Sequence, residues 1–164
     1  MTYDIVSLPS KKRRTSSKRP KTALKRKKKE KTISALTKEL DTVVSRFVRL
    51  SRADPEGMVI CYTCGHKAHY KKIHAGHYIT RFFKATRWDL RNLRPQCFMC
   101  NIYRKGNAVI FRQNLVKEYG EEEIKEMEKS VDFLVRGGLR REYLQEQIAV
   151  FAAKTDILTS DPAY

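Results

Sequence analysis

The chain has 164 residues and a mass of 19.2 kDa, room for one ordinary domain or for a small domain with a tail. A hydrophobic fraction of 41% allows a core and argues against wholesale disorder, while 35 Lys and Arg against 18 Asp and Glu give a formal net charge of +17. No stretch approaches the roughly 18 consecutive apolar residues of a membrane span, and the N-terminus lacks the apolar segment of a signal peptide, so neither a membrane protein nor a secreted one is expected.

The positive charge is concentrated near the N-terminus. Residues 11–31 contain 13 Lys and Arg and a single acid, a net charge of +12 that leaves +5 for the rest of the chain. Like charges at this density repel one another, so residues 1–31 are expected to form a disordered basic arm. Its expected partner is nucleic acid, because Lys and Arg side chains that neutralise phosphates release the counterions condensed on them. A solubilising tail and a localisation signal are the alternatives. The arm residues predicted to contact nucleic acid are Lys11, Lys12, Arg13, Arg14, Lys25, Arg26, Lys27, Lys28 and Lys29.

Apolar spacing predicts the first structural elements. Between residues 32 and 53, apolar side chains recur every three or four positions, which is typical of an amphipathic helix that stops at the turn of residues 54–57. Residues 58–62 are β-prone, and residues 65–100 show no helical period. Short strands and loops are therefore expected in the middle of the chain.

Three further helices are predicted, over residues 108–119, 121–135 and 140–154. Gly120 is a good terminator between the first two, and three acids open the second, where they suit the positive end of a helix. The apolar stripes of these helices are assigned to the core. The predicted organisation is a basic arm (1–31), a helix (32–54), a central finger (55–107), a C-terminal helical segment (108–155) and a frayed tail (156–164).

All four cysteines fall into two CxxC pairs with 32 residues between them: Cys61 and Cys64, then Cys97 and Cys100. Two residues between thiolates let one turn present both sulfurs to a single ion, so two such knuckles predict a structural four-cysteine zinc site. The gap exceeds the roughly 15–20 residues of a common zinc ribbon, so other structure is inserted between the knuckles. Iron in place of zinc, disulfides and a redox-active CxxC are the alternatives.

The insert holds all four histidines of the chain: His66, His69, His74 and His77. With four thiolates available, a histidine ligand in a mixed zinc site is the lesser alternative. His66 and His69 lie among glycine and lysines and are expected to be exposed. His74 and His77 precede a basic and aromatic stretch and are the candidates for chemistry.

An ordered set of short motifs resembles the NinG (Rap) family of lambdoid phage recombination endonucleases. The motifs are Cys61 to Gly65, Ala75 to Tyr78, Arg91 to Asn101 and Lys105 to Asn107. The resemblance covers roughly residues 58 to 155. It implies an α+β fold: a small zinc-clamped ββα-metal (HNH-like) finger flanked by α-helices, preceded by the disordered basic arm.

The resemblance also implies roles for single residues. His77 matches a general base that deprotonates water, a task suited to an imidazole at neutral pH. Asn101 matches an asparagine that offers its carbonyl oxygen to a catalytic Mg²⁺ or Mn²⁺, and Asn92 one that braces the loop holding the base. Gly76 stands where many such nucleases carry an aspartate ligand, so His74 is the candidate for the second ligand, with packing or substrate contact as its alternatives.

Basic residues beyond the arm are candidates for phosphate contacts, since Lys and Arg position proteins on nucleic acid. The aromatic residues near them either stack on unpaired bases or fill the core. The phosphate candidates are Arg81, Lys84, Arg87, Arg104 and Lys105, and the aromatic ones are Phe82, Phe83 and Trp88.

The expected function is that of a metal-dependent endonuclease that cuts branched DNA, such as Holliday junctions or D-loops, the preference for branches coming from the resemblance alone. The alternative is a non-catalytic zinc-knuckle DNA-binding protein of recombination, and an RNA-binding protein is a weaker third reading. A homodimer is expected because branched DNA is often two-fold symmetric. A phage recombinase is a possible partner, and the cytoplasm of the infected or lysogenic host is the expected place of action.

Overall fold

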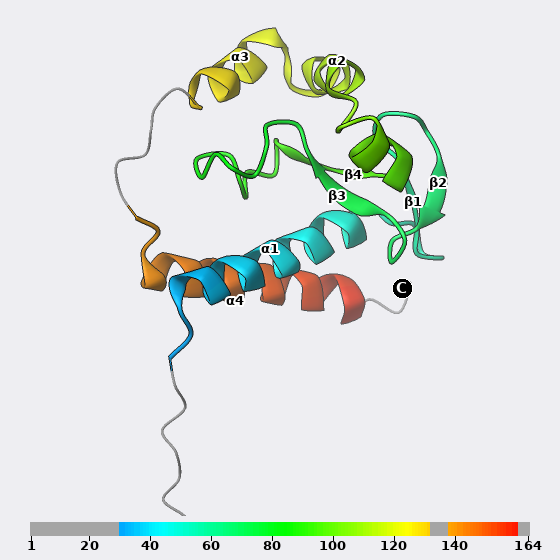
Figure 1. Ribbon diagram of the computed structural model, residues 1–164. Coiled ribbons are helices and arrows are strands. Elements are labelled where there is room, and N and C mark those ends of the chain that lie inside the picture. Colours follow the sequence, from blue (N-terminus) through cyan, green and yellow to red (C-terminus); the bar gives the residue numbers. More distant parts are fainter. Residues whose placement is uncertain (1–29, 132–137, 161–164) are drawn as a thin grey trace, which may run out of the picture. The chain divides into compact units, whose positions relative to one another are not determined.

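A computed structural model describes residues 30–131 and 138–160. The chain divides into two units, Met1–Glu30 and Lys31–Tyr164. All the arm residues predicted to contact nucleic acid lie outside the described residues. The elements of the second unit, drawn in Figure 1, are α1 (Ile33–Leu50), β1 (Met58–Ile60), β2 (Lys67–His69), β3 (His74–His77), β4 (Leu93–Gln96), a π-helix η1 (Met99–Tyr103), α2 (Ala108–Tyr119), α3 (Glu121–Lys129) and α4 (Arg141–Ser160).

Helix α1 begins and ends on local signals in its sequence. The hydroxyl of Thr32 accepts a hydrogen bond from the backbone N–H of Ala35, the arrangement of a helix N-cap. The helix stops at Leu50, three residues before the predicted end. The chain leaves the helix there because the N–H of Ala53 bonds to the carbonyl of Leu50, a tighter turn that ends the helical pattern. The predicted turn follows, in which Gly57, at φ +75°, donates its N–H to the carbonyl of Asp54.

Helices α1 and α4 lie side by side (Figure 1) and form the larger apolar core. Their contact also corrects the prediction that the chain frays after residue 155. Helix α4 continues to Ser160, because Thr155 is buried and its hydroxyl donates to the carbonyl of Phe151. The buried members of this core are Leu36, Leu40, Val44, Val48, Trp88, Leu93, Leu144 and Phe151.

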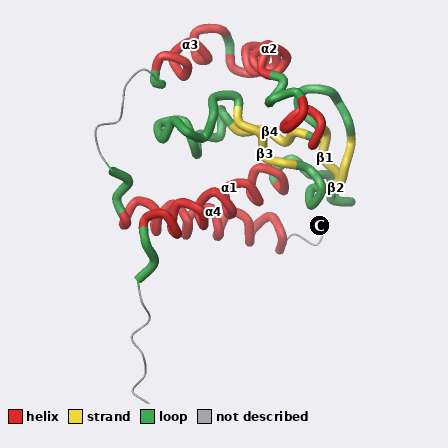
Figure 2. The backbone as a smooth tube through the Cα atoms, viewed as in Figure 1, coloured by secondary structure: helices red, strands yellow, loops and turns green. Residues whose placement is uncertain are grey.

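The strands form two short antiparallel pairs, seen in Figure 2 as separate yellow segments among loops. β1 pairs with β2, and β3 pairs with β4 in a register that places His74 opposite Gln96 and His77 opposite Leu93. The short helix η1 follows β4 directly, so two paired strands and a helix succeed one another. The protein is a small mixed α/β domain, and the predicted strands and loops of the middle region are present.

Helices α2 and α3 pack together through a separate apolar cluster. Its buried side chains are Phe111 and Leu115 from α2 and Ile124 and Met127 from α3. Gly120, at φ +90°, separates the two helices as predicted. Helix α3 ends at Lys129, so the described part of the predicted helix 121–135 is shorter than expected. Among the described residues, no helix combines the length and apolar character needed to cross a membrane.

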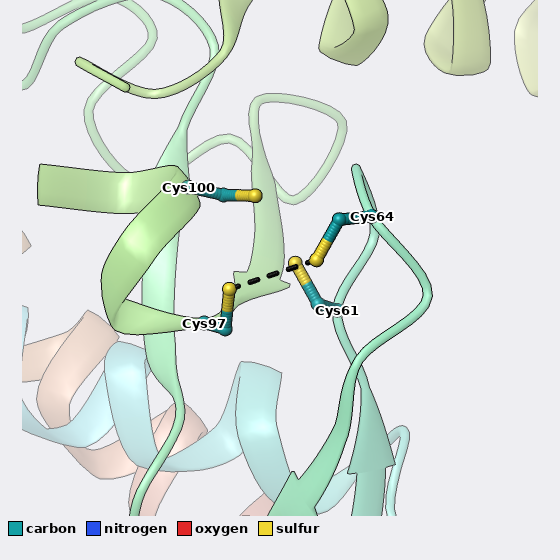
Figure 3. Close-up of side chains that lie close together, drawn as sticks. All are labelled: Cys61, Cys64, Cys97 and Cys100. Carbon is teal, nitrogen blue, oxygen red and sulfur yellow. Dashed lines mark hydrogen bonds between the residues drawn. The ribbon is translucent and has the colours of Figure 1, made fainter. Parts of the chain in front are cut away.

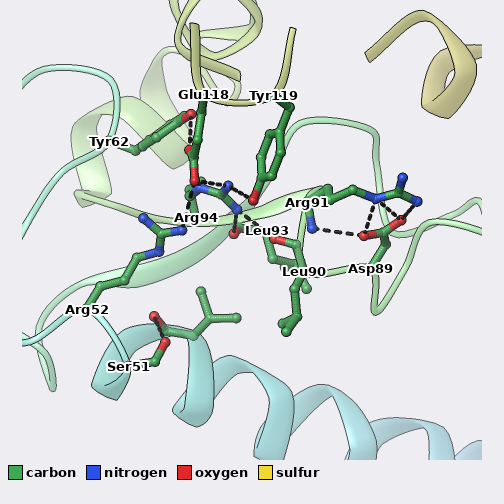
Figure 4. A network of polar contacts seen from close by, with 11 residues as sticks. Ser51, Arg52, Tyr62, Asp89, Leu90, Arg91, Leu93, Arg94, Glu118 and Tyr119 are labelled. Atoms are coloured by element: carbon green, nitrogen blue, oxygen red, sulfur yellow. Dashed lines mark hydrogen bonds and ion pairs between the residues drawn. The ribbon is translucent and has the colours of Figure 1, made fainter. Parts of the chain in front are cut away.

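A buried arginine joins α2 to the central strands (Figure 4). Arg94, only 1% exposed, donates to both carboxylate oxygens of Glu118 and to the backbone carbonyls of Leu90 and Leu93. Its guanidinium also lies 5.2 Å from the ring centroids of Tyr62 and Tyr119. Because Tyr62 follows the first zinc-knuckle cysteine, this network fixes the knuckle, β4 and the end of α2 to one another.

Candidate functional site

The four cysteine side chains converge from two segments (Figure 3): Cys61 and Cys64 from the loop after β1, and Cys97 and Cys100 from the junction of β4 and η1. Their sulfurs all lie within 4.8 Å of one another, and those of Cys64 and Cys97 are 3.7 Å apart. A disulfide needs about 2.05 Å between sulfurs. Four sulfurs placed tetrahedrally about 2.3 Å from a zinc ion lie about 3.8 Å from one another. The cluster therefore fits a structural zinc ion, as the spacing predicts.

The surroundings of the cysteines favour a thiolate at Cys61 and oppose one at Cys64 and Cys97, whose pKa values are raised by burial. Gly65, at φ +76°, closes the first knuckle by donating its N–H to the carbonyl of Cys61. Burial pushes the pKa of the Cys61 thiol up, but hydrogen bonds to its sulfur, first among them one from the backbone of Cys97, lower that pKa overall to about 6. Burial raises the pKa of Cys64 to about 12. A bound cation is needed for all four sulfurs to ionise together.

A cleft of about 740 Å³ lies beside this cluster, between α1, β3, η1 and the loop after β3. Its lining brings together the three residues that the resemblance assigns to chemistry: His74, His77 and Asn101. Asp41 is the one acid among the described residues of the lining. The basic residues of the lining are Arg49, Lys71, Arg81, Arg87 and Lys105. This excess of positive charge suits a phosphate-containing ligand.

The imidazole of His77 is held in one tautomer by its surroundings. Its Nε2 lies 3.1 Å from the backbone carbonyl of Arg87, which can only accept a hydrogen bond, so Nε2 carries the proton and Nδ1 keeps its lone pair. Burial lowers the pKa of His77, and the charges of Arg81 and Arg87 add to this effect, while the carbonyl of Arg87 and the carboxylate of Asp41 act against it. His77 is therefore neutral at pH 7 and able to accept a proton.

Asp41 holds the loop that contacts His77. Its carboxylate accepts hydrogen bonds from the guanidinium of Arg87 at 2.6 and 2.9 Å and from the indole N–H of Trp88 at 2.9 Å. Arg87 also donates to the carbonyl of Arg81. Helix α1 thus fixes the carbonyl that orients the imidazole. Sequence reasoning missed Asp41, because it lies next to the buried stripe of α1 and reads as one more solvated acid.

His74 and Asn101 form a neighbouring pair of potential ligands. Nδ1 of His74 lies 3.0 Å from the side-chain Nδ2 of Asn101. As it stands, this contact is a hydrogen bond; with the amide turned to present its oxygen, the two residues would offer one nitrogen and one oxygen ligand to a divalent cation. The cysteines are the only cluster of three or more Cys, His, Asp or Glu found in residues 30–131 and 138–160. A cation in the cleft would therefore complete its coordination with water and substrate oxygens, as Mg²⁺ commonly does.

The structure explains the absence of an acid at Gly76. A Cβ atom at this position would overlap the side-chain oxygen of Gln96 and lie 2.7 Å from its Cδ. Gln96 is fully buried and donates to the carbonyl of Gly106 at 2.7 Å and to the hydroxyl of Thr63 at 3.2 Å, so it cannot swing away without losing both bonds. The space that a side chain at position 76 would need is filled by an amide that links the first cysteine pair, through Thr63, to Gly106 after η1.

Asn92 lies behind the cleft and is fully buried. Its side-chain oxygen accepts from the N–H of Ile79 at 2.6 Å, and its amide donates to the carbonyls of Ile79 and Thr86, each at 2.9 Å. These bonds span the loop that begins directly after His77. They are of the kind expected of a residue that braces the loop of the base.

The predicted phosphate contacts divide by position. Arg81, Arg87 and Lys105 line the cleft, but the Arg87 guanidinium is already paired with Asp41. Lys84 is exposed and is not among the cleft-lining residues, and Arg104 lines a second depression beside the cysteines.

Of the aromatic candidates, Trp88 is buried in the core and packs there, whereas Phe82 is 80% exposed. Asp89 accepts hydrogen bonds from the backbone and side chain of Arg91.

Fold and site together define a small mixed α/β protein in which a four-cysteine cluster able to bind zinc adjoins a basic, histidine-containing cleft. A family model described as "Bacteriophage Lambda NinG protein" matches residues 6–160, and the chain belongs to this NinG family.

Similar curated proteins are all called protein ninG. That of Escherichia phage 933W is 34% identical over 94 residues, which cover 57% of this chain and 44% of the relative. That of Escherichia phage lambda is 33% identical over 94 residues, with the same coverage, and that of Salmonella phage P22 is 33% identical over 92 residues, 56% of this chain and 43% of the relative. The matches thus span less than half the length of these relatives. No solved structure matches the chain significantly.

Proposed function

We propose that this protein is a metal-dependent DNA endonuclease of the HNH type that acts on branched recombination intermediates, Holliday junctions or D-loops. One observation carries the proposal: a neutral imidazole shares one basic cleft with a hydrogen-bonded His–Asn pair that would supply two metal ligands once the amide is turned. The preference for branches rests on the family resemblance. A homodimer, a recombinase partner and action in the cytoplasm of the host belong to the same proposal.

The chemistry assigned to the cleft is hydrolysis of one phosphodiester. Nδ1 of His77 takes a proton from a water molecule, whose oxygen attacks phosphorus while the bond to the 3′-oxygen breaks. The departing 3′-oxygen takes a proton from solvent water, so the products are a 5′-phosphate and a 3′-hydroxyl. A divalent cation bound by His74 and Asn101 would stabilise the charge on the phosphate and on the departing oxygen. Arg81 and Lys105 hold the phosphate from the walls of the cleft.

The test is a cleavage assay with synthetic junctions and linear duplex, each with Mg²⁺ or Mn²⁺. His77→Ala is expected to lower the rate on junctions by about 10²–10⁴-fold, the usual contribution of a general base. His69→Ala is the matched control, because His69 lies on β2 and is not among the residues that line the cleft. Equal rates for the wild type and His77→Ala, or no cleavage by either, would end the proposal.

A second candidate function is that of a non-catalytic zinc-knuckle protein that binds DNA with the same surface. The lack of an acid at position 76 and the small number of metal ligands in the cleft favour it. This protein would bind junctions equally well with or without His77 and would cleave none in any metal. Competition between DNA and RNA at one salt concentration separates it from an RNA-binding protein.

Asp41→Asn tests how the base is positioned. The substitution weakens the ion pair with Arg87 and leaves that guanidinium charge close to His77. Two effects are expected: kcat falls about tenfold with little change in KM, and the acidic limb of the pH–rate profile moves to lower pH. The sign follows because the Asp41 carboxylate raises the pKa of His77 and the arginine lowers it. In the wild type, that limb already lies below the ordinary histidine pKa of about 6.5.

Asp156→Asn is the control for Asp41→Asn, since Asp156 lies on α4 and is exposed. A lower kcat with an unmoved pH profile would mean that Asp41 supports the fold alone. An unchanged kcat would contradict its role altogether.

A further inference from the structure

The outer face of η1 is apolar and exposed. It consists of four residues, Phe98, Met99, Ile102 and Tyr103, whose exposed fractions lie between 49% and 69%. The other side of the same short helix contributes Cys100 to the metal cluster and Asn101 to the cleft. This surface, called here the η1 face, therefore presents large apolar side chains immediately beside the proposed site of chemistry.

Aromatic rings connect the η1 face to the cleft. The His74 ring lies 5.8 Å from that of Phe98, and Phe98 lies 5.5 Å from Tyr103, both in edge-to-face contact. His74 is also the ring whose Nδ1 pairs with Asn101. A strand with its phosphate at His74 and Asn101 would thus carry a neighbouring base past Phe98 and Tyr103.

Positive charge flanks the η1 face on both sides. Lys105 and Lys71 line the cleft on one side, and Lys72 and Arg104 line a depression of about 380 Å³ on the other. Among the described lining residues of these two hollows, Asp41 is the single acid, and Arg87 neutralises it. A second copy of this chain would bring the same cations to the same place, which like-charge repulsion opposes. A nucleotide offers both a planar ring for the apolar side chains and phosphates for the cations.

We propose that the η1 face is a stacking platform for an unpaired base adjacent to the scissile phosphate, with Tyr103 as the stacking ring and Phe98, which meets it edge-to-face, as its support. The inference rests on the proposed function for the location of the phosphate. It adds a structural basis for preferring branched or gapped DNA, since a base that remains paired in a duplex cannot stack on a protein ring.

The test uses the full-length, zinc-loaded chain without added Mg²⁺ or Mn²⁺, so that binding is read separately from cleavage. The probes are a DNA duplex with one unpaired 2-aminopurine and a fully paired duplex of equal length that also contains it. For the wild type, we expect stronger quenching of the unpaired base than of the paired one. Tyr103→Leu should abolish the extra quenching and weaken binding of the first probe about tenfold, with little effect on the second. Tyr103→Phe, which keeps the ring, should behave as the wild type.

Two results would overturn the inference. One is equal affinity of Tyr103→Leu and the wild type for the unpaired probe, or an equal loss on both probes. The other is a dimer of the wild type that Tyr103→Leu converts to monomer in sedimentation, which would make the η1 face an interface between copies. If stacking is found but no metal supports cleavage, the proposed function fails while the platform stands.

Discussion

Replacing Cys97 by serine is expected to remove the structural zinc and to unfold the central part of the protein. Its sulfur meets those of the other three cysteines at the junction of β4 and η1, so the ion ties the first knuckle to the helix that carries Asn101. Structural zinc contributes about 10–16 kcal/mol in small zinc-dependent domains, so the loss of one ligand is expected to cost several kcal/mol of folding free energy. Metal analysis should show less than one zinc per chain, and the thermal unfolding temperature should fall.

A chelator provides the control for Cys97→Ser. EDTA is expected to lower the unfolding temperature of the wild type toward that of the variant and to have little further effect on the variant itself. Met99→Leu, a volume-conserving change at an exposed position two residues away, should keep both zinc and stability. A Cys97→Ser protein that retains one tightly bound zinc and melts like the wild type would contradict the assignment of the four cysteines as ligands.

Glu118→Leu is expected to destabilise the fold by about 3–5 kcal/mol, and more strongly than Arg94→Met does. The difference arises from burial: the Arg94 side chain is 1% exposed, so it keeps an uncompensated buried charge when Glu118 is lost. The Glu118 side chain is 33% exposed, so water can solvate its carboxylate when Arg94 is removed. Denaturant unfolding at pH 7 measures both free energies. If Arg94→Met lowers the free energy of unfolding as much as Glu118→Leu does, the guanidinium stabilises the fold by packing between Tyr62 and Tyr119 instead.

The same ion pair predicts acid sensitivity. Partial burial pushes the pKa of Glu118 up, but hydrogen bonds from Arg94 and Tyr62 lower it more, so the folded pKa lies below the ordinary value. A carboxylate with a depressed folded pKa stabilises the protein above its unfolded pKa of about 4.3, and this contribution is lost as the pH falls through the folded pKa. Glu118→Gln, which cannot ionise, should therefore show a smaller loss of stability than the wild type between pH 5 and pH 3.

Local patterns predicted those features that depend on residues close in sequence. The apolar stripe of α1 and the glycine between α2 and α3 have short-range causes, and the strands around the cysteines fall where the helical period is absent. The cysteine spacing alone predicts the cluster, because few other uses suit two CxxC pairs without a secretory signal. The predicted end of the last helix was wrong, because only the contact between α4 and α1 shows that Thr155 is buried.

The working parts of the cleft depend on contacts across long sequence separations. Asp41 reaches Arg87 and Trp88 from 46 and 47 residues away, and nothing near it in the chain marks it as different from Glu39, the other acid of α1. The role of Gln96 is equally invisible, because the need for glycine at position 76 appears only when the paired strand is in place. The order of the motifs predicted which residues gather at the cleft. The tautomer of His77 could not be predicted, because it depends on the backbone carbonyl of Arg87.

The close approach of Gly76 and Gln96 restricts how this protein could evolve toward nucleases with a carboxylate at that position. Gly76→Asp alone would force the buried amide off its two partners, so a single mutation leads to a damaged protein. Trimming Gln96 first would open the space but leave Thr63 and Gly106 without their shared donor. A carboxylate at position 76 therefore requires coordinated changes at Gly76 and Gln96, because either change alone disrupts the packing around the buried amide.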